Sequence, residues 1–292
     1  MRRRAFLAAA ALLGALPLRA AARERFTRGL LWRVSKKGVA PSHVFGTIHV
    51  ADPRLAELPA QVAKAFDAAR SLMLEYLPDG YSRERFLEAA MFLDGRTLEQ
   101  MIGASDFERA LEHLKPIGLS REFVNKLKPW GVLLNLRNPG GADGSPLDAQ
   151  LLERARARRM PLYQIEGVEE QIFTFDEFPM ESQVALLRHS LEHRDELLAL
   201  SARTLEAYLA GDLSAIWRLR EDFARRHPQI AAHQAIMTKR VVYDRSVVMA
   251  FRMQRQLRRG GAFVALGALH LYGEKGVLAL LAEDGYRAAR VF

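Results

Sequence analysis

Apolar and polar positions along the chain predict short buried strands at both ends and amphipathic helices between them. Residues 29–49, "GLLWRVSKKGVAPSHVFGTIH", hold two apolar runs joined by a Lys-Lys-Gly turn, which indicates two strands. Residues 55–70 carry apolar side chains at helical spacing, and residues 71–78, "SLMLEYLP", form an apolar run closed by proline. The N-terminal part is therefore predicted to contain a β-α-β unit.

The C-terminal part has the same order of patterns. Residues 261–271, "GAFVALGALHL", predict a strand, residues 273–285 a helix stopped by glycine, and residues 286–292 a final strand. Mostly helical sequence lies between the two ends, at about 82–137 and 179–259, separated by a Gly/Pro loop, a helix and an apolar strand that ends in Glu166. The predicted fold is α/β, with a core sheet built from both ends and the middle of the chain and with large helical insertions.

Two of the apolar runs end in the same motif, Gly-x-x-His. The first reads "VFGTIHV" at 44–50 and the second "ALGALHL" at 265–271. Crossovers between parallel strands are right-handed, so the carboxyl ends of the strands meet at one edge of the sheet, where ligands bind in such folds. His49, His270 and Glu75 are therefore predicted to face one cleft.

Glu75 interrupts a run whose neighbours predict burial on both faces of a parallel sheet. A buried carboxylate needs a cation or hydrogen-bond donors beside it, because leaving it unpaired is costly. Two imidazoles and a carboxylate would suit Zn²⁺, Mn²⁺ or another transition metal, which polarises carbonyls and lowers the pKa of water. Gly46 and Gly267 would let the backbone turn sharply and approach such an ion closely. A structural role for each histidine is the alternative.

Two further residues are candidates for the same site. Glu166 is interpreted as a metal ligand, a general base or a helix cap ahead of "GVEEQ", with capping preferred. Arg245 lies 15 residues before Gly260, about 22 Å of helix rise, and the following strand climbs about 20 Å. Arg245 should thus stand level with the second motif, able to stabilise an oxyanion or bind a carboxylate, unless it lies on a solvated face.

The remaining histidines are interpreted as structural. His189 and His193 have the i, i+4 spacing of a helical zinc pair, but in "HSLEH" no glutamate follows the first histidine directly. They are predicted to lie on the wet face of an amphipathic helix. His227 and His233 are predicted to be helix-end and surface residues. The sequence contains no Gly-x-Ser-x-Gly, P-loop or dinucleotide motif, which argues against serine hydrolases and nucleotide-binding enzymes.

The first 22 residues are predicted to be a signal peptide. Arginines precede an uncharged run from Ala5 to Leu18, too short for the roughly 20 residues of a membrane-spanning helix, and small residues follow at 20–22. The segment Arg3-Arg4-Ala5-Phe6-Leu7 matches the twin-arginine pattern, and an ordinary secretory leader is the alternative. Both predict a periplasmic or secreted protein, and no later segment is long and apolar enough to span a membrane.

The amino-acid composition limits which metal ligands and which partners the protein can have. The 292 residues are 49% apolar, enough to fill a core, and they include no cysteine, so any catalytic metal must be held by His, Asp or Glu. Without the leader and its four arginines, 39 basic residues face 34 acidic ones, a net charge of +5. Arginines cluster at 154–159 and 251–261 without aromatic residues between them. They are predicted to lie on solvated helix faces, with no nucleic-acid partner.

Several segments together resemble one family. The segments "LLWRVSKKGVAPSHVFGTIHVAD", "LMLEY", "LKPW", "LLERARARRMPLYQIEGVEEQ", "AYLAGDL" and "FVALGALHLYGEKGVLALLAEDGYRAARVF" are similar, in this order, to the TraB/GumN family, which includes the Tiki metalloproteases. The resemblance runs from Leu30 to Phe292. It implies that residues 23–292 form one α/β domain of the EreA/ChaN-like type.

The resemblance also implies a function and a set of site residues. It implies a peptidase-like site that depends on a divalent metal, with Mn²⁺ or Co²⁺ as the ions and a peptide or protein as substrate. The family's motifs fall on Gly46, His49, Glu75, Gly267 and His270, and its Arg-Asn pair falls on Arg245 and Ser246. Serine in place of asparagine puts the amide's hydrogen bond in doubt. The alternative is an envelope protein that binds haem or a saccharide fragment in the same cleft without turnover.

Overall fold

The computed structural model describes residues 26–50, 52–136 and 145–292, so the predicted signal peptide lies outside the described residues. A mixed six-stranded sheet forms its centre, in the order β4-β3-β5-β2-β1-β6. Its strands are β1 (Leu31–Ser35), β2 (Ser42–Thr47), β3 (Ser71–Leu74), β4 (Leu162–Gln164), β5 (Ala262–Gly267) and β6 (Arg287–Arg290). The α/β fold predicted from the sequence, with a sheet drawn from both ends and the middle of the chain, is confirmed.

The order of the strands differs from two simple β-α-β repeats. β5 pairs in parallel with β2 on one side and with β3 on the other, so it separates the two strands of the N-terminal unit. β6 lies at the far edge, where it pairs antiparallel with β1. This arrangement brings the two Gly-x-x-His strands together as direct neighbours, and the strand that precedes Glu75 lies next to them.

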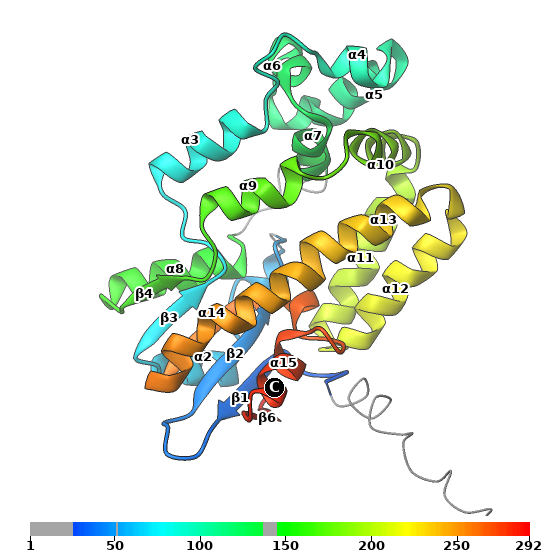
Figure 1. Cartoon of the computed structure of the whole chain (residues 1–292). Coiled ribbons are helices and arrows are strands. Elements are labelled where there is room, and N and C mark those ends of the chain that lie inside the picture. The colour runs from blue at the N-terminus through cyan, green and yellow to red at the C-terminus, as the bar shows by residue number, and fades with distance from the viewer. Residues whose placement is uncertain (1–25, 51, 137–144) are drawn as a thin grey trace, which may run out of the picture.

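Helices cover the sheet and extend well beyond it (Figure 1). The first group comprises α2 (Ala60–Asp67), α3 (Gly80–Ala89), α4 (Leu98–Ile102), α5 (Ala104–Leu114), α6 (Arg121–Lys126), α7 (Pro129–Leu136), α8 (Leu147–Ala157) and α9 (Val168–Asp176). The second group comprises α10 (Met180–Glu192), α11 (Arg194–Leu209), α12 (Leu213–Arg226), α13 (Ala231–Thr238), α14 (Arg245–Arg259) and α15 (Val277–Glu283). The helices α3 to α7 and α10 to α14 correspond to the two helical insertions predicted from the sequence, and α2, α8 and α15 to the helices predicted between strands.

The described residues form two hydrophobic cores. The first packs around the sheet and includes Phe45, Phe66 and Phe263, which are fully or almost fully buried. The second lies within the helical insertions and is centred on Trp130, whose ring stacks on Phe175 at 5.4 Å between centroids. In Figure 1 the helices that form most of this second core, among them α5, α7 and α10, stand above the sheet. The insertions therefore have an apolar core of their own and do not depend on the sheet alone for packing.

A π-helical segment, Lys239–Asp244, joins α13 to α14, and together they cross the sheet as one long helix in Figure 1. Isolated π-helical turns are rare and often lie at functional sites. Here the π-helical turn ends immediately before Arg245, the first residue of α14. Arg245 thus occupies the end of α14 that is nearest the second motif, as its spacing from Gly260 predicted.

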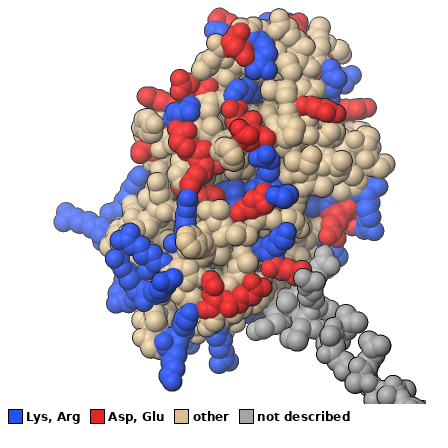
Figure 2. Space-filling view, in the orientation of Figure 1, with Lys and Arg blue, Asp and Glu red and all other residues tan. Residues whose placement is uncertain are grey.

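The surface carries charges of both signs over most of the face seen in Figure 2. Basic side chains gather at the lower left of that view, near the ends of α8 and α14. Arg154, Arg156 and Arg158 are exposed, which confirms that the arginine run of α8 is solvated. Among the residues described, no helix is long and apolar enough to cross a membrane.

Candidate metal centre

Three neighbouring strands bring the two motif histidines and the predicted carboxylate to one edge of the sheet. Thr47 of β2 pairs with Gly267 of β5, so the two motifs leave the sheet side by side. A Cβ atom built on Gly267 would lie 3.3 Å from Oε1 of Glu75, 3.5 Å from Cδ2 of His270 and 3.8 Å from Nε2 of His49. The three side chains therefore border one small space that is open because residue 267 has no side chain.

Glu75 is buried, with 7% of its surface exposed, and it is fully paired. Its Oε1 accepts a hydrogen bond from the N–H of Gly267 at 2.5 Å, and its Oε2 forms an ion pair with Nη2 of Arg245 at 2.5 Å. Burial alone would raise the pKa of Glu75, but the neighbouring imidazoles, Arg245 and the Gly267 N–H together lower it to about 2. The sequence-based expectation that this carboxylate needs a cation or donors is thus met, and Glu75 is ionised.

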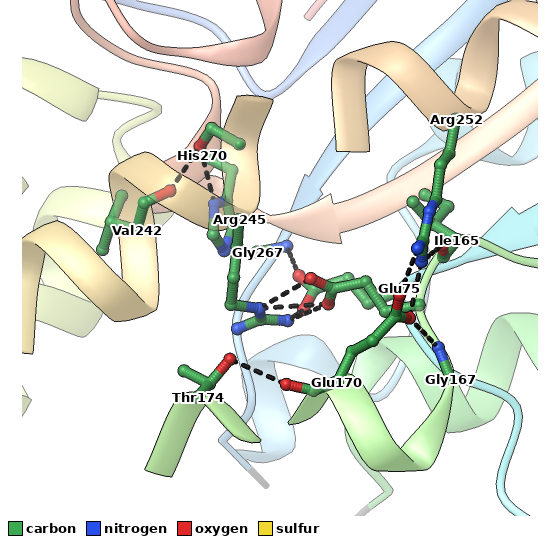
Figure 3. A network of polar contacts seen from close by, with 12 residues as sticks. Glu75, Ile165, Gly167, Glu170, Thr174, Val242, Arg245, Arg252, Gly267 and His270 are labelled. Atoms are coloured by element: carbon green, nitrogen blue, oxygen red, sulfur yellow. Dashed lines mark hydrogen bonds and ion pairs between the residues drawn. The ribbon is translucent and has the colours of Figure 1, made fainter. Parts of the chain in front are cut away.

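Arg245 also binds Glu166, so one guanidinium joins two buried carboxylates (Figure 3). Its Nε lies 3.0 Å and its Nη2 2.6 Å from Oε2 of Glu166. Burial alone would lower the pKa of Arg245, but the two carboxylates raise it, so the side chain stays charged. Burial raises the pKa of Glu166 against the opposing effect of Arg245. Arg245 is therefore a member of the site and does not lie on a solvated face.

The preferred interpretation of Glu166, a helix cap, is wrong. Gly167 is the N-cap of α9, and the side chain that accepts from its N–H is that of Glu170, at 2.7 Å. Glu166 precedes the cap and follows β4, and its own N–H donates to the carbonyl of Glu75 at 2.8 Å. Its side chain accepts from Arg245, so it points into the site and not along the helix.

His270 is buried at the end of a 3₁₀ turn, Ala268–His270, and is oriented by Ser246. The Ser246 hydroxyl lies 2.7 Å from the carbonyl of Val242 and 2.9 Å from Nδ1 of His270. The hydroxyl donates its one proton to the carbonyl, which accepts only, so it must accept from Nδ1–H. Nε2 of His270 then carries the free lone pair, and burial lowers the pKa of the ring to about 4. Ser246 thereby provides a hydrogen bond that fixes the orientation of the His270 ring.

His49 has a partner that the sequence did not reveal, Asp148 in the first turn of α8. Nδ1 of His49 lies 3.0 Å from Oδ2 of Asp148, and Thr47 donates to Oδ1 of the same carboxylate at 2.9 Å. This contact raises the pKa of His49 to about 9. Nδ1 faces the carboxylate, so Nε2 is the nitrogen that borders the Gly267 space. A carboxylate behind a histidine is the arrangement that orients metal-binding imidazoles.

The structure explains the glycines of the two motifs in another way than the sharp turn predicted from the sequence. Gly267 has φ −55° and Gly46 is not among the residues with positive φ, so neither makes a turn that requires glycine. A Cβ on Gly46 would lie 2.7 Å from Cδ1 of Leu271, and the Gly46 carbonyl accepts from the buried Tyr208 hydroxyl at 2.8 Å. Close packing of the two motifs explains Gly46, and room for the three donor side chains explains Gly267.

The predictions for the other histidines are partly wrong. His189 is 5% exposed and His227 is 8% exposed, so neither lies on a wet surface, although His227 does end α12 as predicted. His233 is half-buried, with Nδ1 2.8 Å from the Ser182 hydroxyl. The reason is the hairpin of α11 and α12, which covers the end of α10 and which a helical pattern alone does not show. Within the described part of the chain, His189, His193 and His227 form a group whose ligand atoms all lie within 4.8 Å of one another.

Replacing Asp148 should weaken metal binding at the strand ends while leaving the fold intact. In Asp148→Asn the side chain keeps its contact with Thr47 but loses the charge that holds the His49 ring. We expect the affinity for a divalent ion to fall about 10- to 100-fold, the usual effect of removing a partner of a metal-binding histidine. Isothermal titration with Mn²⁺, Co²⁺ and Zn²⁺ measures it. An unchanged affinity for the metal in a folded variant would show that Asp148 has no role in metal binding.

Comparison with known proteins places this chain in a family. The model of the TraB/PrgY/gumN family matches residues 30–290. Metalloprotease TIKI2 of Xenopus tropicalis is 24% identical over 88% of this chain and 58% of its own length, and metalloprotease TIKI1 of Homo sapiens is 24% identical over 88% and 60%. The chain thus spans about three fifths of the TIKI proteins.

A bacterial relative is covered more fully. YbaP of Shigella flexneri is 25% identical over 82% of this chain and 88% of its own length. No solved structure matches this chain significantly. The family model covers nearly all of the described residues, including both Gly-x-x-His motifs, Glu75 and Arg245. The chain belongs to the TraB/PrgY/gumN family.

Proposed function

We propose that this protein is a metal-dependent hydrolase that cleaves peptide bonds at the edge of the sheet where β2, β5 and β3 end. The observation that carries the proposal is the space at Gly267, which His49, Glu75 and His270 border within 3.8 Å of a single point. The names of the TIKI relatives, which are metalloproteases, support the same reaction class.

The residues at this edge suit a divalent ion. His270 presents the lone pair of Nε2, His49 presents Nε2 once this nitrogen has released its proton, as metal binding requires, and Glu75 is ionised. The carboxylates of Glu75, Glu166 and Asp148 outnumber the single guanidinium of Arg245, so a cation is favoured electrostatically. We assign His49, Glu75 and His270 as the ligands of Mn²⁺, Co²⁺ or Zn²⁺. When bound, such an ion polarises a carbonyl and lowers the pKa of water.

The protein's own side chains have separate tasks in this proposal. Nε and Nη2 of Arg245 are engaged with carboxylates, and Nη1 takes no part in these contacts. Nη1 is therefore the donor that we assign to a substrate carboxylate or to the oxyanion of a peptide carbonyl. Glu166 holds the guanidinium in place and is a positioning residue. Ser246 and Asp148 fix the ring orientations of His270 and His49.

Removal and return of the metal tests the proposal. The purified protein without residues 1–22, stripped with a chelator, should lose hydrolysis of a peptide library. Added Mn²⁺, Co²⁺ or Zn²⁺ should restore hydrolysis by the wild type. The same additions should restore no hydrolysis in His49→Ala or His270→Ala. Asp52→Asn, which alters a half-buried carboxylate that pairs with Arg54 on the loop after His49, is the matched control and should behave as the wild type. Hydrolysis that survives complete removal of metal would reject the proposal.

The alternative function, binding of haem or a saccharide fragment without turnover, predicts other results. Such a binder gains little from an ionised Glu75 held among two imidazoles and a guanidinium. Spectroscopic titration with haem and a glycan array distinguish the two functions: tight haem or glycan binding that His49→Ala abolishes, in a protein that hydrolyses no peptide, would favour the alternative.

The same proposal includes export. Residues 1–22 would be removed as a signal peptide, by either the twin-arginine or the general secretory route, and residues 23–292 would act as one domain in the periplasm or outside the cell. Mass spectrometry of the protein from the periplasmic fraction of its host tests this point, because a chain that starts near residue 23 is expected there.

A further inference from the structure

Three histidines of the second helical insertion lie close together in the structure, although they come from different helix ends. His189 lies in the last turn of α10, and His193 lies at the junction between α10 and α11. α11 and α12 form a hairpin, side by side in Figure 1, which returns His227 at the end of α12 to the start of α11. The centroids of the three rings are 4.3, 4.5 and 4.7 Å apart.

His189 brings an unsatisfied nitrogen into this cluster. Its side chain is buried, and Nε2 has no hydrogen-bond partner among the described residues. Burial lowers the pKa of His189 to about 4, with a further contribution from the two other histidines, so the ring is neutral at pH 7. A buried polar nitrogen without a partner destabilises the fold, and a bound ion would offset this cost.

His227 is oriented by a carboxylate in the way that metal-binding histidines commonly are. Its Nε2 lies 2.8 Å from Oε2 of Glu196, a residue in the first turn of α11. Hydrogen bonding to Arg226 lowers the pKa of Glu196, so its carboxylate is ionised and can only accept a hydrogen bond. Nε2 of His227 is therefore the donor, and Nδ1 keeps the lone pair that a cation would use.

We infer that His189, His193 and His227 form a second divalent-metal site, which takes an ion that prefers imidazole, such as Zn²⁺ or Co²⁺. Their ligand atoms all lie within 4.8 Å of one another. Three imidazoles leave a fourth position for water, as in other sites with three protein ligands. The ion would join the end of α10 to the end of α12 and so brace the helical insertion.

Packing without an ion is the competing explanation. The rings of His189 and His227 also contact Phe223, at 5.6 and 4.5 Å between centroids. A purely structural cluster is explained by these aromatic contacts, but it leaves Nε2 of His189 unpaired. The two explanations differ in one measurable property, which is the binding of metal that does not depend on the strand-end site.

The test uses the protein with residues 23–292 and the double substitution His49→Ala, His270→Ala, which removes two proposed ligands of the strand-end site. After chelation, calorimetric titration with Zn²⁺ alone should show one ion per chain, and Co²⁺ should give the visible absorption of a four-coordinate complex. Adding His227→Ala should abolish both signals. Adding His233→Ala, which breaks only a contact with Ser182, should change neither.

Glu196→Gln guards against loss by misfolding, because Glu196 is partly exposed and its replacement keeps the side-chain size. In the same background this change should weaken Zn²⁺ about 10- to 100-fold, with an unchanged circular dichroism spectrum. A folded double variant that binds no Zn²⁺, or that binds it equally well with His189→Phe, would overturn the inference. The result is independent of hydrolysis, so failure of the proposed function leaves it standing.

Discussion

Gly267→Ala should abolish metal binding and hydrolysis while the protein stays folded. The new Cβ would lie 3.3 Å from Oε1 of Glu75 and 3.8 Å from Nε2 of His49, in the space that the donor side chains border. Of these distances, only the one to the Glu75 carboxylate is shorter than an ordinary van der Waals contact. Alanine can adopt the φ of −55° at this position, so the fold should tolerate the methyl group. We expect peptide hydrolysis to fall about 100-fold or more, since a displacement of about 1 Å in a catalytic site has this effect.

The first motif supplies a matched control. Gly46→Ala places its Cβ 2.7 Å from Cδ1 of Leu271 and 3.1 Å from Cα of Ala268, so it strains the packing between the motifs. This variant should lose stability, by about 1–3 kcal/mol as for other overpacked sites. Calorimetric metal titration and urea unfolding of both variants separate the two roles. If Gly267→Ala bound metal as the wild type does, the ligand assignment at the strand ends would be wrong.

Arg245→Ala should destabilise the protein by about 3–5 kcal/mol, because it leaves two buried carboxylates without their cation. Glu75 and Glu166 have only 10% and 4% of their side chains exposed, so water replaces the guanidinium poorly. Arg245→Lys should recover only part of the loss, since one ammonium group cannot reproduce the fork that joins both carboxylates. Urea unfolding of the metal-free protein measures both changes.

The control for this prediction lies on the same helix. Arg252 pairs with Glu170 of α9, but 38% and 41% of these side chains are exposed. Arg252→Ala should therefore cost less than about 1 kcal/mol. Combining Arg245→Ala with Glu166→Gln should regain stability relative to Arg245→Ala alone, because one buried charge is removed. Equal effects of Arg245→Ala and Arg252→Ala would show that burial does not govern the Arg245 network.

The sequence predicted the strands, the helical insertions and the position of Arg245, because hydrophobic periodicity and the repeated motif are local signals. It also brought His49, Glu75 and His270 to one edge, since strand direction follows from right-handed crossovers. It did not predict that β5 would lie between β2 and β3, because sheet order depends on packing between segments more than 190 residues apart.

Partners that come from distant segments were the other features that sequence patterns missed. Asp148 is an ordinary first-turn residue of α8, and nothing near it in sequence indicates His49. Glu166 was placed next to a helix start, where capping is the common role, but its direction is set by Arg245 on another element. The burial of His189 likewise depends on the return of α12. In each case the residues next to it in the sequence predict a more exposed or a purely local role than the one that the distant contact gives it.

The central position of β5 has a consequence for how the chain assembles. When β2 and β3 have been synthesised, the strand that must lie between them is still almost 190 residues from being made, and each of them has an unpaired edge toward that gap. Long-range pairing of this kind slows folding and leaves strand edges open to other chains. Loss of the last 31 residues would remove β5 from the centre of the sheet together with the edge strand β6. The nascent chain therefore has to be kept from aggregating until its C-terminus has been made.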